Sequence, residues 1–263
     1  MPYAVFMLLF VIIPLGLIIF YAFTDSSGQF SLSNWGDLFT SQEKWKVIGI
    51  TFLIALLTTF FCILIAYPIA FLLSNSKFNK NKVLVYIFLL PMWINFVVRT
   101  IGLKALVNGT THALFGFDLT ATHPIIAVVI GMVYDYLPFA ILPLYNQMLK
   151  MDKNQIEAAA DLGANPFQVF VKTIIPMTIP GIISAVMMTF MPTMSSYVIA
   201  YHMSNGKESI IGTLIEFYIN SGGSNGYNAG SVLSLVMLLI IGISIVVQKL
   251  LEKKDDSRKE GIW

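Results

Sequence analysis

One carboxylate, Asp135, lies near the middle of an apolar stretch, residues 124–149, that carries no other charged side chain. A charge inside a membrane-spanning segment is costly, and such a group usually faces the interior of a helix bundle or a water-filled cavity. Its neighbours Tyr134 and Tyr136 are aromatic, and aromatic faces attract organic cations. This combination is suited to steadying a cation that passes through the membrane.

Two interpretations of Asp135 stay open. It could line a path for a cationic substrate, or it could pair with Arg99, Lys104 or a backbone group and stabilise the fold. Aromatic side chains usually anchor or pack membrane helices, and a loop carboxylate is usually solvated. The further candidates for the path are two aromatic residues, Trp93 and Tyr197, and one loop carboxylate, Glu216.

A second segment, residues 151–167, has the signals of a short helix, a sharp turn and a new helix. Asp152 is a good N-cap and has Gln155 three residues later, as in a capping box. Residues 156–162 are strong helix formers, and Gly163 is placed to end that helix. Asn165 and Pro166 then suit the N-cap and the first position of the next helix. An alanine-rich helix has a thin face that fits closely into the groove of a partner.

This segment resembles the EAA loop of binding-protein-dependent ABC importer permeases. The resemblance rests on Glu157-Ala158-Ala159, on Gly163, and on Pro176 at the family's distance. Thr173 and Ile175 replace the isoleucine and the leucine of the family pattern, which are mild departures. The resemblance implies that the loop docks into a cytoplasmic ATPase subunit and transmits its closure. The implied docking residues are Glu157, Ala158, Ala159, Asp161 and Gly163.

The resemblance also implies partners. They are a second homologous permease, two copies of the ATPase subunit and an extracytoplasmic substrate-binding protein. This chain has no Gly-x-x-x-x-Gly-Lys phosphate loop, so we expect the ATPase subunits to bind ATP and Mg²⁺. We therefore expect no catalytic residue, metal or cofactor in this chain.

Residues 90–104 and 137–145 resemble the spermidine/putrescine permeases of that family. This implies a polyamine as the transported solute. Importers of other small solutes share parts of these stretches, so a different solute is the alternative.

Composition limits the class of protein. Of the 263 residues, 57% are hydrophobic and 11% are charged, whereas a soluble domain has about 25% charged residues. The basic residues form no stripe, so nucleic-acid binding is not expected. Cys62 is the one cysteine, which excludes an intrachain disulfide.

The apolar residues occur in blocks long enough to cross a bilayer, which takes about 20 residues. We predict an all-α membrane protein with six transmembrane helices, the docking loop lying between the fourth and the fifth. Residues 1–251 form one permease domain and 252–263 a cytoplasmic tail. The fifth span contains Pro176, Pro180 and Pro192 and should be kinked. The predicted spans are 3–23, 47–73, 83–107, 124–149, 173–200 and 229–247.

Lysine and arginine are distributed unevenly between the two sides that six spans define. Segments 74–82, 150–172 and the tail after residue 247 carry 3, 3 and 5 of these residues. Segments 24–46, 99–123 and 202–228 carry 2, 2 and 1. The positive-inside rule therefore places both termini and the docking loop in the cytoplasm, with the chain in the cell's inner membrane.

Other classes of membrane protein fit less well. Secondary transporters often show inverted repeats with broken helices in matching halves, and this chain shows no such symmetry. It also lacks His-Glu-x-x-His and Gly-x-Ser-x-Gly, the motifs of membrane metalloproteases and serine hydrolases. The histidines, His112, His123 and His202, all lie in predicted outside segments, which argues against haem or redox work.

Overall fold

The computed structural model describes residues 2–75, 83–221 and 225–260, with side chains described for 3–75, 83–220 and 225–250. Most of the predicted loop 74–82 and the last three residues of the predicted tail lie outside the described residues. Over the described part the chain is almost entirely helical, which confirms the all-α prediction. The β-type pairing described there is an isolated bridge between Thr24 and Phe30.

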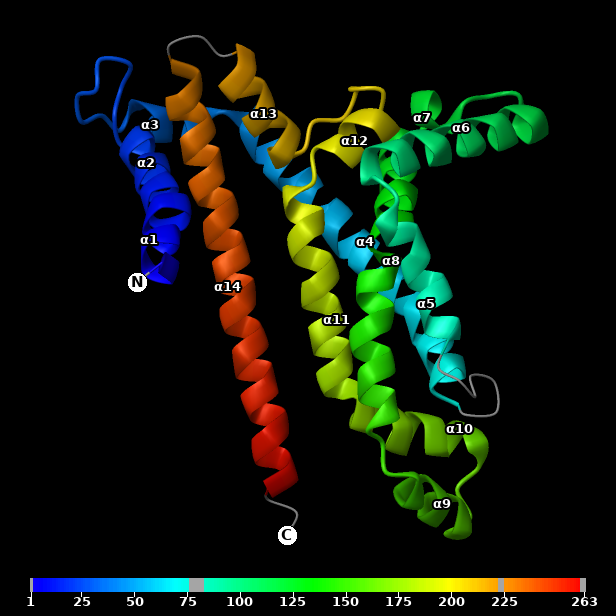
Figure 1. The fold of residues 1–263 in the computed structure, drawn as a ribbon. Coiled ribbons are helices and arrows are strands. Elements are labelled where there is room, and N and C mark those ends of the chain that lie inside the picture. The colour runs from blue at the N-terminus through cyan, green and yellow to red at the C-terminus, as the bar shows by residue number, and fades with distance from the viewer. Residues whose placement is uncertain (1, 76–82, 222–224, 261–263) are drawn as a thin grey trace.

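Three long helices form the centre of the bundle (Figure 1). They are α4 (Gln42–Ser74), α8 (Pro124–Leu149) and α11 (Ile175–Ser195). Buried alanines face one another between them, including Ala66 of α4 and Ala140 of α8. Small residues let membrane helices approach closely and pack without large side chains between the backbones.

The first and last spans pack together beside this centre (Figure 1). The amide of Asn228, at the start of the last helix, donates to the backbone oxygens of Tyr21 and Thr24 at 3.0 and 2.6 Å. The remaining elements are α1 (Pro2–Met7), a π-helical turn (Leu8–Ile12), α2 (Ile13–Ala22), α3 (Ser33–Thr40), α5 (Leu84–Leu89), a 3₁₀ turn (Leu90–Trp93), α6 (Phe96–Phe115), α7 (Leu119–Thr122), α9 (Lys153–Asp161), α10 (Pro166–Val169), a π-helical turn (Phe170–Ile174), α12 (Val198–Met203), α13 (Ile211–Ser221) and α14 (Gly226–Glu260).

Five helices in the described part are long and apolar enough to cross a membrane, and a sixth span results if one bent pair counts as a span. The five are Tyr3–Ala22, Gln42–Ser74, Pro124–Leu149, Pro166–Ser195 and Gly226–Leu250. The predicted spans 3–23, 47–73, 124–149 and 229–247 lie almost wholly within these helices. The predicted tail from residue 252 continues α14 as far as Glu260.

The predicted third span, 83–107, is wrong as one continuous helix. Leu84–Trp93 and Phe96–Phe115 meet at an angle of 100°, and α6 runs across the end of the bundle (Figure 1). Pro91 lies in the 3₁₀ turn before the break, where it has no N–H to continue a helix. The Asn95 side chain then accepts hydrogen bonds from Val97 N and Val98 N and starts a new helix.

The predicted fifth span, 173–200, ends early. Helix α11 stops at Ser195, three residues after Pro192, and the backbone of Ser196 is extended. The chain resumes as the short helix α12. Pro192 has no N–H to donate to the residue four positions earlier, which weakens the last turns of α11 before this end.

The two ends of the bundle differ in what they carry. Helices α9 and α10 and the C-terminal end of α14 lie at one end (Figure 1). The elements at the other end are α3, α6, α7, α12 and α13 (Figure 1). The predicted docking loop and the predicted path residues around Tyr197 therefore lie at opposite ends.

Candidate functional site

Asp135 is buried inside α8, with 1% of its surface exposed. Arg99 Nε of α6 donates to one carboxylate oxygen. Thr100 Oγ1 donates to the other at 2.8 Å. Of the two interpretations of Asp135, the structure displays the ion pair with Arg99.

The same arginine holds the break in the third span. Its Nη1 donates to the backbone oxygen of Pro91 at 2.8 Å, and its guanidinium lies 5.7 Å from the ring centre of Tyr134. Arg99 thus connects the end of the 3₁₀ turn, the start of α6 and the middle of α8. Pro91 O also accepts from Ile94 N at 3.3 Å, so Arg99 adds a second hydrogen bond at the bend.

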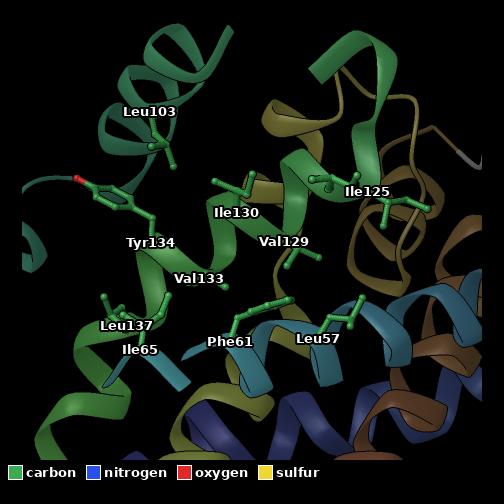
Figure 2. Close-up of a pocket in the computed structure, with 11 residues that line it drawn as sticks. Leu57, Phe61, Ile65, Leu103, Ile125, Val129, Ile130, Val133, Tyr134 and Leu137 are labelled. Atoms are coloured by element: carbon green, nitrogen blue, oxygen red, sulfur yellow. The ribbon is translucent and has the colours of Figure 1, made fainter. Parts of the chain in front are cut away.

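Tyr134 lines an apolar groove of about 630 Å³ between α4, α6 and α8 (Figure 2). Tyr136 points elsewhere, and its hydroxyl donates to the backbone oxygen of Pro192 in α11 at 3.3 Å. Trp93 is 86% exposed at the break after α5. The structure therefore does not gather these three aromatic residues around Asp135 in one polar cavity. The apolar groove is lined by Leu57, Phe61, Ile65, Leu103, Ile125, Ile126, Val129, Ile130, Val133, Tyr134 and Leu137.

Tyr197 and Glu216, the other two path candidates, line one pocket of about 290 Å³. The pocket lies where α11 ends and α13 packs against α14. Its lining includes two hydroxyls and one amide, from Ser195, Ser234 and Asn220. Of the six path candidates, the structure thus brings Tyr197 and Glu216 together in one pocket, and it leaves Asp135, Tyr134, Tyr136 and Trp93 in different surroundings.

The segment after α8 folds as a helix, a tight turn and a second helix. Gly163 has φ +86°, and its N–H donates to Ala160 O while Ala164 N–H donates to Ala159 O, at 2.9 and 3.2 Å. This pair of bonds is a Schellman ending, in which the residue at the Gly163 position adopts the left-handed conformation. The Asp152 side chain accepts from Asn154 N.

The capping box lies at the second helix of the segment. The Asn165 side chain accepts from Gln168 N at 2.8 Å, and the Gln168 side chain accepts from Asn165 N at 3.0 Å. The sequence pattern suggested a box at Asp152 and Gln155, where the structure has a simple cap. The Asn-x-x-Gln spacing at Asn165 would have indicated the correct position.

Helix α9 has no buried residue. Four of the expected docking residues, Glu157, Ala158, Asp161 and Gly163, are exposed, and Ala159 is half-buried. Beside them Leu162 is 89% exposed and Phe167 is 74% exposed, although neither was expected to contribute. A short helix without a buried face gains little from its own chain, so its apolar side chains are available to a partner.

Helices α8 and α11, which precede and follow the segment in the chain, contact each other directly. Gln147 Nε2 of α8 donates to Met177 O of α11 at 3.0 Å. A Cβ at Gly181 would lie 2.6 Å from Gln147 Cβ, so the two helices approach each other closely there. Nothing in the sequence pattern indicated Gln147 or Gly181, because their pairing depends on tertiary packing.

Among the described residues no three His, Cys, Asp or Glu side chains gather as metal ligands.

Solved structures with a similar fold are transporters. A bacterial alginate ABC transporter in complex with an alginate pentasaccharide-bound periplasmic protein has a chain that superposes with a TM-score of 0.71 at 16% identity, covering 96% of this chain and 92% of that one. The inward-facing MetNI methionine ABC transporter has a TM-score of 0.58 at 18% identity, covering 82% and 99%. At these identities the likeness concerns the fold.

Sequence relatives carry the likeness further. The spermidine/putrescine transport system permease protein PotB of Haemophilus influenzae is 32% identical over 94% of this chain and 92% of its own length. PotB of Escherichia coli strain K12 is 33% identical over 76% of each chain. The PotB homolog of Mycoplasma genitalium is 28% identical over 87% of this chain and 80% of its own. Residues 63–255, which include α8, α9, α10 and α11 and most of α14, match the family model. The chain belongs to the binding-protein-dependent transport system inner membrane components.

Proposed function

We propose that this chain is the permease subunit of an ATP-driven importer of polyamines of the spermidine and putrescine type. The observation that carries the proposal is the likeness to spermidine/putrescine permeases over 94% of the chain at 32% identity. A polyamine is a linear organic polycation, so its path needs carboxylates and aromatic faces.

We propose that residues 152–163 dock into the ATPase subunit. The exposed face of α9, with Glu157 and Ala158, and the exposed Leu162 beside Gly163 support this assignment. A groove in the partner would cover the apolar side chain that this chain leaves in solvent. The contact between Gln147 and Gly181 then transmits movement of the segment to both α8 and α11.

The partners follow from this role. One such subunit supplies half of a path and docks one ATPase subunit, so the complex contains a second homologous permease and two ATPase copies. ATP and Mg²⁺ bind to those ATPase copies. An extracytoplasmic binding protein delivers the solute, and both termini of this chain lie in the cytoplasm.

Reconstitution of the complex with its binding protein tests the proposal. Loading the binding protein with spermidine or putrescine should stimulate ATP hydrolysis and drive uptake into proteoliposomes. A panel of sugars, amino acids and anions provides the controls. Stimulation by one of these solutes alone would replace the polyamine with another cargo, and uptake that needs an ion gradient but no ATP would indicate a secondary transporter.

A further inference from the structure

The pocket at the end of α11 is formed by a broken helix and a short helix that crosses it. Helix α13 approaches so closely that a Cβ at Gly212 would lie 3.0 Å from Ser195 O and 3.2 Å from Ser196 O. Its first turn is held by Ile211 N–H, which donates to Thr51 Oγ1 of α4 at 2.9 Å. Helix α13 is therefore fixed against the bundle, and the pocket opens at the surface beside it, with Tyr197, Glu216 and Asn220 exposed.

The polar groups of this pocket present acceptors. Ser234 Oγ donates its proton to Gly230 O at 2.8 Å, and Ser195 Oγ donates to Pro192 O at 3.3 Å. The Asn220 amide donates to Glu216 Oε1 at 2.8 Å. Because the two serine protons are engaged on backbone oxygens, the serine oxygens keep lone pairs for a ligand, and the side-chain oxygen of Asn220 is a further acceptor.

Electrostatics at the pocket favour a cation. The C-terminal end of α11 contributes a partial negative charge, and Glu216 adds a full one. Within the described residues Glu216 forms no salt bridge, whereas Asp135 is paired with Arg99. The ammonium of Lys44 lies over the ring of Tyr218, 5.7 Å from its centre, and within the described residues it forms no salt bridge with Glu216.

We propose that this pocket binds an ammonium group of the transported polycation. Glu216 supplies the counter-charge, Tyr197 an aromatic face, and Ser195, Ser234 and Asn220 the acceptors for its N–H groups. The inference rests on the proposed polyamine transport and identifies Glu216, in place of Asp135, as the carboxylate that meets the cargo. With a volume of about 290 Å³, the pocket is at the lower limit of small-molecule sites, which start at about 300 Å³, and holds one end of a linear polyamine.

The position of the pocket suits this role. Its lining comes from the residues around the end of α11, from α13 and from α14. The end of α11 and helix α13 lie at the end of the bundle opposite α9 (Figure 1). A solute released by an extracytoplasmic binding protein reaches this end first. Weak capture of one ammonium group there orients the polycation without holding it, as passage requires.

Uptake of radiolabelled spermidine by the reconstituted complex tests the pocket through Glu216→Gln. The variant keeps the oxygen that accepts from Asn220 but loses the charge, so uptake should fall about tenfold while the melting temperature stays unchanged. Glu208→Gln is the matched control: it removes a carboxylate from the connection before α13, outside the pocket, and should change uptake by no more than about twofold.

A second variant covers a loss of stability. Asn220→Asp, combined with Glu216→Gln, places the carboxylate one helical turn away in the same pocket and should restore part of the uptake. If the wild-type complex takes up spermidine and the Glu216→Gln variant takes it up equally well, the proposed role of the pocket is wrong and the proposed function stands. If Glu216→Gln lowers the melting temperature and adding Asn220→Asp restores none of the uptake, the proposed role of the pocket is also wrong. Wild-type transport of a different solute alone would overturn the proposed function.

Discussion

Asp135 and Arg99 place opposite charges inside the apolar part of the bundle, and each charge is compensated there by the other. Both oxygens of the carboxylate are engaged, by Arg99 and by Thr100. Arg99 also reaches Pro91 O at the break of the third span. Loss of one partner of such a buried pair leaves an uncompensated charge in a low dielectric.

Asp135→Asn should therefore destabilise the protein by about 3–5 kcal/mol, because Arg99 stays buried without its counter-ion. Thermal unfolding of the detergent-solubilised complex measures the loss. Asp37→Asn, which changes an exposed carboxylate in α3, is the control and should stay within about 0.5 kcal/mol. Unchanged unfolding together with lost transport would instead place Asp135 on the path.

The charge of Asp135 and its position in a span could be predicted from the sequence, but its partner could not. Arg99 and Lys104 were both available, and the pair joins residues 36 positions apart in the chain. Which cation reaches the carboxylate depends on the bend after Trp93. The meeting of Tyr197 with Glu216 depends in the same way on where α11 breaks.

At the scale of elements, the third span shows where hydropathy fails. The stretch Leu84–Trp93 rises about 15 Å at 1.5 Å per residue, half of a bilayer core of about 30 Å. The uncharged run before Arg99 suggested a longer helix. A hydropathy window does not see the cap at Asn95 or the ion pair, which together redirect the chain by 100°.

Cysteine labelling distinguishes the bent span from a straight one. Gly102 and Gly109 are both exposed and lie two turns apart on one face of α6. If α6 lies along the membrane surface, Gly102→Cys and Gly109→Cys should react with an impermeant thiol reagent at similar rates from the same side. A straight span would bury Gly102→Cys in hydrocarbon, so its lack of reaction would contradict the bend.

The helix, turn and helix of residues 151–167 were predictable because their signals are local. Caps and the glycine ending act within a few residues, and Asp152, Gly163 and Asn165 occupy the expected positions. The contact between Gln147 and Gly181 was not predictable, since it joins two helices.

Glu157→Lys, which reverses a charge on the exposed face of α9, should weaken recovery of the ATPase subunit without changing assembly of the bundle.

Gly163→Ala should impair coupling for a backbone reason. A Cβ there meets no atom within 4 Å, so the cost comes from φ +86° and amounts to about 1 kcal/mol. Recovery of the ATPase with the purified permease and the ratio of uptake to ATP hydrolysis should both fall. Gly49→Ala in α4, also free of contacts, should be neutral. Normal coupling in Gly163→Ala would remove the docking role.

For the whole molecule, the arrangement of the two ends sets a topology that one labelling experiment can check. Helices α9 and α10 share an end with the C-terminal part of α14, and α6, α12 and α13 lie at the other (Figure 1). The basic residues follow the same division, 11 against 5 over the predicted segments. Because basic loops remain on the cytoplasmic side, α9 should be inside.

Glu208→Cys and Gln155→Cys test that orientation in intact cells. Both positions lie outside the apolar spans, and the natural Cys62 is buried, so the unmodified chain serves as the background. An impermeant thiol reagent should label Glu208→Cys from outside and leave Gln155→Cys unlabelled until the membrane is permeabilised. The reverse pattern would place α9 outside, away from any cytoplasmic ATPase, and would also put the Glu216 pocket on the wrong side of the membrane for a solute delivered by a binding protein.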